Sequence, residues 1–140
     1  MKKIAWVLDE VVLAVHDEQL AEHGGLSGIR DRGAVESALA RPRNLAAYDA
    51  CDDLARLAAA YAYGVARNHG FADGNKRTAL VIADLFLMLN GHELVSSPAD
   101  NVLTILGVAD GTLSEEELTL WIRKNMEPQA TRRPRLGKSI

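Results

Sequence analysis

Two apolar segments in the middle of the chain, residues 54–68 and 78–90, flank a short stretch of very different composition. The first segment repeats apolar residues at steps of three and four, and the second is apolar at nearly every position except Asp84. Such steps predict an amphipathic helix, and an apolar run of this length predicts a helix that is buried on every side. We therefore expect the fold to be built around this pair of helices.

The composition favours a helical protein of one domain. Alanine and leucine are abundant and only 5% of the residues are aromatic, a bias that favours helices over sheet. The 140 residues suffice for one core that buries about two thirds of the surface of the unfolded chain. We predict an all-α fold with one domain over residues 1–126. Residues 127–140 lack periodicity and are predicted to be a disordered basic tail.

The first predicted helix carries two of the four histidines. Asp9 is expected to cap this helix, and the glycines that follow His23 are expected to end it. His16 and His23 have no partner at metal-ligand spacing. We expect both side chains to be partly exposed and polar.

Capping residues and prolines predict the limits of the other helices. A short helix is expected to begin after Asp31 and to end at Pro42, because the residue before a proline is pushed out of the α region. The next helix is expected to run from Asp53 to Asn68, and a later one from Ser97 to Gly111. A capping box at residues 114–117 is expected to begin the last helix. Residues 92–95 are expected to be extended.

Charge and cysteine content exclude several classes of function. The formal charge of −3 combines a tail of +4 over residues 128–140 with an acidic body of −7, which argues against a broad nucleic-acid surface. Cys51 is the single cysteine, so no intramolecular disulfide is possible. The apolar run at residues 4–8 is too short for a signal peptide or a membrane span. We expect a cytoplasmic protein without a direct nucleic-acid or membrane partner.

The stretch between the two apolar segments, residues 69–78, has the composition of a functional site. It holds one base, one carboxylate, two glycines and two cations within nine residues, whereas an ordinary turn needs little more than a glycine. Its backbone enters the second helix at Asn75, where free N–H groups and the helix dipole favour an anion. Gly74 permits close approach of a ligand, and Lys76 and Arg77 add positive charge. This part of the loop is predicted to bind phosphate.

Asp73 and His69 are the candidate reactive groups of the loop. The Asp73 carboxylate either pairs with Arg77 or binds a divalent ion that accompanies a nucleoside triphosphate, and we favour magnesium. His69 either forms a structural hydrogen bond or accepts the proton of an attacking hydroxyl as a general base. These residues favour phosphoryl or nucleotidyl transfer, and they do not choose between the two.

The loop also carries a resemblance that covers most of the chain. The sequence HGFADGNKRT at residues 69–78 resembles the signature of the Fic/Doc superfamily, and its ending resembles the death-on-curing (Doc) branch. Further similar stretches are Trp6, His16 with Asp17, residues 24–26, residues 36–42, residues 59–62 and residues 87–91. The resemblance implies an all-helical Fic fold with the signature loop and its following helix at the centre.

Three departures from the typical Fic motif bear on the reaction. Typical members transfer AMP from ATP, but here Gly70 replaces a proline, Lys76 replaces a glycine and Leu80 replaces the final arginine. Doc-type proteins share the lysine and are protein kinases that transfer the γ-phosphate of ATP to elongation factor Tu, which stops translation. The resemblance therefore implies ATP and Mg²⁺ as cofactors.

The resemblance also implies roles and partners. His69 would be the base, Asp73 the magnesium ligand and residues 75–77 the phosphate clamp. Lys76 and Arg77 would also act in catalysis, Gly74 would contact the cofactor and Arg67 would assist. The protein would be a toxin that is neutralised by an antitoxin whose segment folds into a groove. Three alternatives stay open: an AMP or nucleotidyl transferase with the same loop, a toxin that acts only by binding a partner, and a ribonuclease toxin.

Overall fold

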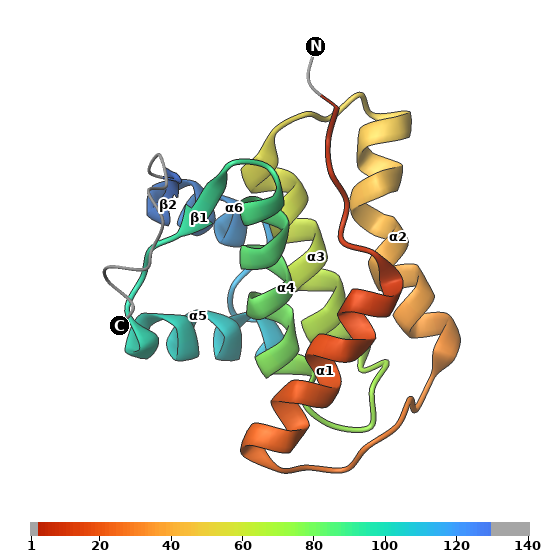
Figure 1. Cartoon of the computed structure of the whole chain (residues 1–140). Coiled ribbons are helices and arrows are strands. Elements are labelled where there is room, and N and C mark those ends of the chain that lie inside the picture. Colours follow the sequence, from red (N-terminus) through yellow and green to blue (C-terminus); the bar gives the residue numbers. More distant parts are fainter. Residues whose placement is uncertain (1–2, 130–140) are drawn as a thin grey trace, which may run out of the picture.

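The computed structural model describes residues 3–129, and in this range two central helices are covered on both sides (Figure 1). Helices α3 and α4 lie in the middle, with α1 and α2 on one side and α5 and α6 on the other. The elements are α1 (Asp9–His23), α2 (Arg32–Tyr48), α3 (Leu54–Asn68), α4 (Asn75–Leu89), β1 (His92–Leu94), α5 (Pro98–Asp110), α6 (Glu115–Asn125) and β2 (Met126–Pro128). The expected helical fold is confirmed, with one two-stranded sheet added.

Helix α3 forms the centre of the core. Ten of its fifteen residues are buried, and most of them are alanines, which allow neighbouring helices to approach closely. The helix approaches α2 closely at Gly64, where an added Cβ would lie 3.2 Å from the Cα of Ala38. The Asp53 side chain caps α3 by accepting hydrogen bonds from two backbone N–H groups, as the sequence predicts.

Helix α4 is central but is not buried on every side, so this part of the sequence prediction is wrong. Its inner face, which includes Ile82 and Phe86, is fully buried. Val81, Met88 and Leu89 are exposed. Helix α4 therefore has one apolar face in the core and a second apolar face that is exposed.

The prediction that α2 ends at Pro42 is also wrong. Asp31 caps the helix as expected, but α2 continues through Pro42 to Tyr48. A proline inside a helix removes one hydrogen bond and costs about 3 kcal/mol or more. Pro42 is fully buried, so the packing of α2 against the core offsets this cost.

The two ends of the described chain differ from the sequence prediction in detail. Leu8 occupies the N-cap position of α1, and Asp9 lies in the first turn without a capping hydrogen bond. Strand β2 pairs with β1 in antiparallel register, so Glu127 and Pro128 extend the ordered domain past its predicted end at Met126. The rest of the predicted tail, residues 130–140, lies outside the described residues. None of the described helices is long and apolar enough to cross a membrane.

Candidate functional site

The predicted site loop connects the two central helices and turns twice through left-handed backbone. His69 follows the last residue of α3 with φ 52° and ψ 42°, and its side chain is exposed. Gly74 precedes the first residue of α4 with φ 79°. A positive φ is uncommon for a residue other than glycine, so the surrounding contacts must hold His69 in this conformation.

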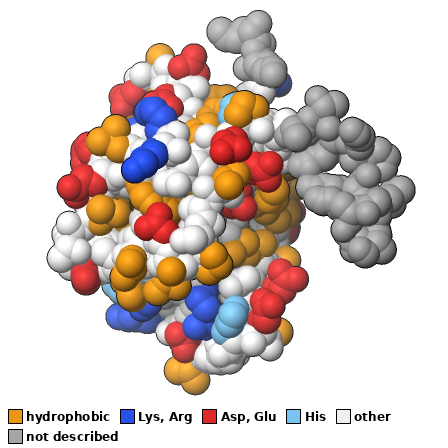
Figure 2. All heavy atoms as spheres, turned by 90° about the vertical axis from the view of Figure 1, so that its left-hand side faces the viewer, with side chains coloured by type: hydrophobic (Ala, Val, Ile, Leu, Met, Phe, Trp, Pro, Cys, Tyr) orange, Lys and Arg blue, Asp and Glu red, His pale blue; other side chains and the backbone are white. Residues whose placement is uncertain are grey.

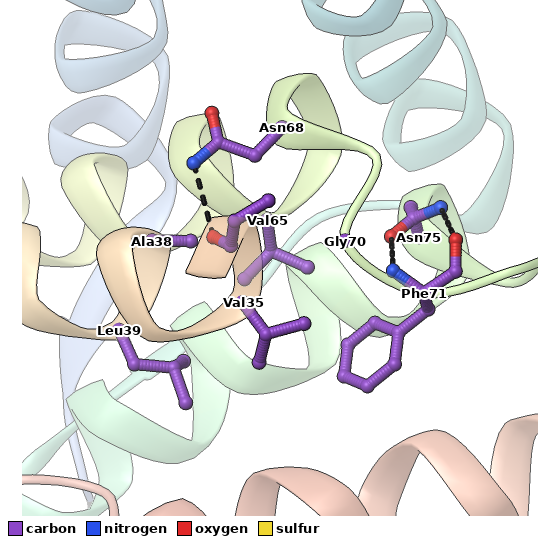
Figure 3. Close-up of a pocket in the computed structure, with 9 residues that line it drawn as sticks. Val35, Ala38, Leu39, Val65, Asn68, Gly70, Phe71 and Asn75 are labelled. Carbon is purple, nitrogen blue, oxygen red and sulfur yellow. Dashed lines mark hydrogen bonds between the residues drawn. The ribbon is translucent and has the colours of Figure 1, made fainter. Parts of the chain in front are cut away.

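The inner side of the loop is fixed by Asn75 and Phe71 (Figure 3). The Asn75 side chain accepts a hydrogen bond from the Phe71 N–H at 3.1 Å and donates one to the Phe71 carbonyl at 3.0 Å. The Phe71 ring is buried, as expected. Only about 10 Å³ of space remains between these residues and α2, barely enough for one water. The Asn75 side chain thus closes the loop and leaves its backbone N–H for a ligand.

A second segment, residues 24–31, lies along the loop and pairs with it. The Gly70 carbonyl accepts hydrogen bonds from the N–H groups of Arg30 and Asp31, at 2.8 and 3.0 Å. The Ala72 N–H donates to the Gly28 carbonyl at 3.0 Å, and Ile29 and Phe71 form an isolated antiparallel bridge. The loop is therefore held by backbone that lies about forty residues earlier in the sequence.

Asp73 has a carboxylate that is fixed in direction. Its Oδ2 accepts a hydrogen bond from the Leu26 N–H at 3.2 Å, and its Oδ1 accepts one from the Gly74 N–H at 2.9 Å. These backbone bonds, the Leu26 bond first, lower the pKa of Asp73 below its usual value. The carboxylate is therefore charged at neutral pH and retains lone pairs for a cation.

The carboxylate of Asp73 suits Mg²⁺ when phosphate completes the coordination. Among the described residues, no cluster of three or more acidic, histidine or cysteine side chains offers a full metal cage. Mg²⁺ commonly binds through one or two carboxylates together with substrate phosphates and waters. One fixed carboxylate beside a helix N-terminus that is suited to phosphate is compatible with this requirement.

A hollow of about 230 Å³ lies on the outer side of the loop and collects most of the predicted site residues. The first residues of α4 line this hollow, and no side chain caps the N-terminus of the helix, so its first N–H groups and the positive end of the helix dipole are available to a ligand. The residues that line the hollow are Ala66, His69, Ala72, Asp73, Gly74, Asn75, Lys76 and Arg77. The structure thus brings together a base, a carboxylate, two cations and a helix N-terminus.

The three predicted basic residues have different surroundings. Lys76 is exposed at the hollow. The Nη2 atom of Arg77 donates to the Gly24 carbonyl at 2.9 Å, whereas its buried Nε has no hydrogen-bond partner among the described residues. Arg67 does not line the hollow: its Nη1 donates to the Val108 carbonyl at 3.2 Å, at the end of α5. The role of Arg67 stays a prediction.

The sequence prediction for His16 is wrong, and a residue of the site region was missed as a result. His16 is 3% exposed, and its Nε2 lies 2.7 Å from the main-chain oxygen of Asp73. Its ring stacks on Phe71 with 3.8 Å between ring centroids and 12° between planes. The signal that could have found it is the resemblance itself, which includes His16. His23, in contrast, is exposed as expected.

Comparison with known proteins gives the family. The model of the Fic/DOC family matches residues 6–87. A relative named "Protein kinase doc" from Escherichia phage P1 is 38% identical over 115 residues, which are 82% of this chain and 90% of the relative. "Toxin Doc" from Mycolicibacterium smegmatis is 43% identical over 74 residues, which are 52% of this chain and 57% of that relative. The chain therefore belongs to the Fic/DOC family.

Proposed function

We propose that this protein is the toxin of a toxin–antitoxin pair and acts in the cytoplasm as a protein kinase. It transfers the γ-phosphate of ATP to a serine or threonine hydroxyl of a translation factor, with elongation factor Tu as the first substrate to test. The observation that carries the proposal is the hollow in which His69, Asp73, Lys76 and the N-terminus of α4 meet. The name of the phage P1 relative, a protein kinase, supports the same reaction.

The hollow suits phosphate groups rather than a whole nucleotide. Its 230 Å³ is below the range of about 300–1,000 Å³ of drug-sized ligand sites. The N–H groups at the start of α4 bind phosphate oxygens, and Lys76 and Arg77 stabilise the charge that develops on them during transfer. Asp73 would hold Mg²⁺ together with the phosphates, and the ion would supply further positive charge there.

His69 is the general base in this proposal. Its ring removes the proton from the target hydroxyl, whose oxygen forms a bond to the γ-phosphorus. The bond from the γ-phosphorus to the bridging oxygen breaks, and ADP leaves with that oxygen. The exposure of His69 at the rim of the hollow supports this role, because a protein substrate must reach the base.

Labelled ATP tests the reaction. The protein is incubated with purified elongation factor Tu, Mg²⁺ and ATP carrying label on either the α- or the γ-phosphate. We expect γ-label on the factor and none from α-labelled ATP; α-label would instead identify an AMP transferase. The variant His69→Ala should lose at least about a hundredfold in rate, as for a general base. The matched histidine His92→Ala, on β1, should keep the wild-type rate, and growth arrest that survives His69→Ala would mean that the toxin acts by binding alone.

The antitoxin is proposed to cover an apolar groove beside the hollow. Figure 2 shows hydrophobic side chains gathered on the side of the molecule that carries α5, with basic and histidine side chains beside them. The groove encloses about 460 Å³ between α1, α4 and α5 and includes the exposed Val81, Val102 and Leu106. Lys76 and Arg77 line both the groove and the hollow. A partner segment that folds as an amphipathic helix would bury the apolar side chains and reach the phosphate site.

A pair of leucines on α5 tests this surface. Leu106 lines the groove, whereas Leu103 is exposed on the same helix and does not line it. We expect Leu106→Glu to weaken antitoxin binding at least about tenfold, because a charge would be buried in an apolar contact. Leu103→Glu should change the affinity less than about threefold. Equal loss in both variants, measured by calorimetry with the product of the neighbouring open reading frame, would place the antitoxin elsewhere.

A further inference from the structure

His16 contacts the site loop from the interior through three neighbouring groups. Its Nε2 lies 2.7 Å from the Asp73 main-chain oxygen, and its ring is parallel to that of Phe71 within 12°. A Cβ added at Gly74 would lie 3.5 Å from the imidazole. The ring therefore fills the space directly behind the peptide unit that joins Asp73 to Gly74.

The hydrogen bond from His16 fixes the orientation of that peptide unit. A carbonyl oxygen only accepts, so the Nε2 atom carries the proton and donates it. The peptide is planar and trans, so the carbonyl of Asp73 and the N–H of Gly74 are directed to opposite sides. Because His16 draws the carbonyl inward, the Gly74 N–H is directed outward, where it donates to the Asp73 Oδ1 at 2.9 Å.

We propose that His16 is a positioning residue of the site: through this one peptide unit it sets the direction of the Asp73 carboxylate. The bond from the Leu26 N–H holds the other carboxylate oxygen, so both oxygens have a defined direction in a residue that lines the hollow. The effect on phosphate transfer rests on the function proposed above. The effect on the conformation of the loop does not.

Two kinds of substitution separate the donor from the bulk of the ring. His16→Phe keeps an aromatic ring against Phe71 and removes the donor, and His16→Gln keeps a donor and removes the ring. His16→Met is a second variant that lacks the donor, and it replaces His16→Phe if that variant does not fold. Val12→Ala is the matched control, because Val12 is buried on α1 one turn earlier and makes no hydrogen bond to the loop through its side chain.

Hydrogen exchange of the Gly74 amide measures the orientation of the loop without any reaction. Its rate is divided by that of Leu118 in α6, which corrects for a change in global stability. We expect the ratio to rise about tenfold in His16→Phe, because the bond that fixes the peptide is lost. His16→Gln and Val12→Ala should stay within about threefold of the wild type. A wild-type ratio in both donor-free variants would overturn the proposal.

Binding of Mg²⁺-ATP and the rate of γ-label transfer give the functional readouts. In His16→Phe we expect kcat to fall at least about tenfold and the affinity for Mg²⁺-ATP, measured by calorimetry, to weaken. In His16→Gln we expect kcat and this affinity to recover in part. If all variants lose activity only in proportion to their thermal midpoint, as Val12→Ala does, His16 is merely structural and the proposal is wrong. If wild-type protein transfers no γ-label, the proposed function fails, whereas Gly74 exchange and Mg²⁺-ATP binding still decide the role of His16.

Discussion

The Asn75 side chain exchanges two hydrogen bonds with the main chain of Phe71, at 3.1 and 3.0 Å, and so closes the site loop at its base. Asn75→Ala should lower the free energy of unfolding by about 1–3 kcal/mol, because two partly buried backbone groups lose their partners. Asn68→Ala is a matched control, because Asn68 makes one exposed bond, to the Ala34 carbonyl. Asn68→Ala should lower the free energy of unfolding by less than about 1 kcal/mol. Urea denaturation measures both, and equal losses would contradict a special role for Asn75.

Gly70 is required by the approach of the loop to α2. An added Cβ would lie 2.5 Å from Val35 Cγ2 and 2.9 Å from the Val35 backbone nitrogen. We expect Gly70→Ala to destabilise the fold by about 1–3 kcal/mol through overpacking. Gly33→Ala, in the first turn of α2, should be neutral or stabilising, because its Cβ would meet only Asp31 Oδ1 at 3.4 Å. Thermal denaturation that ranks the two variants in the opposite order would refute this account of position 70.

Asp84 should make stability depend on pH in a direction that can be tested. Burial is the main cause that raises the pKa of Asp84, although the Leu94 N–H donates to its Oδ1. The folded state therefore binds the proton more tightly than the unfolded chain, and the charged form at neutral pH lowers stability. Asp84→Asn keeps an acceptor for Leu94 and should raise the thermal midpoint at pH 7. This gain should shrink as pH falls through the raised pKa.

Asp110 is the opposite case and serves as the control for Asp84. Hydrogen bonds from Thr112, its side chain first, lower the pKa of Asp110. Asp110→Asn should therefore lower the midpoint at pH 7, and the loss should disappear as pH falls through the lowered pKa. The same pH trend in both variants would contradict the environments that the structure assigns to the two carboxyl groups.

Glu115 joins α6 to α2 and α3 through two arginines. Its carboxylate, 12% exposed, accepts hydrogen bonds from Arg41 and Arg56. Glu115→Ala should cost about 1–3 kcal/mol, because both guanidinium groups lose their partly buried partner. The exposed neighbour Glu116→Ala should stay within about 0.5 kcal/mol of the wild type. Chemical denaturation at low and high salt measures the free energy of unfolding of each variant. If the destabilisation by Glu115→Ala disappears at high salt, the contact is an ordinary surface ion pair and this prediction is wrong.

Local patterns predicted the helices well where capping and periodicity agreed. The caps at Asp53, Ser97 and Ser114 are confirmed, because each depends only on residues within one turn. Pro42 was predicted wrongly because tertiary packing of α2 outweighs a local penalty. The exposed face of α4 was missed for a related reason, since hydrophobicity alone does not show which apolar residues find a partner within the chain.

The site was predicted from one loop, and the structure gathers most of its residues around one hollow. Two features had no local signal. The side chain of Asn75 is used to close the loop, and the donor behind Asp73 comes from α1. Neither contact is encoded by spacing within residues 69–78, because each depends on how the loop folds back or on which helix packs behind it.

The pairing of residues 28–31 with residues 70–72 has a consequence for the order of events during synthesis. Contacts this far apart in sequence form slowly, because closing the intervening chain costs entropy before the contacts repay it. A nascent chain that has not yet released α4 from the ribosome already contains residues 28–31, but it lacks the helix N-terminus against which the loop is shaped. A cell that makes this protein is therefore exposed to its chemistry only once most of the domain has been translated and folded.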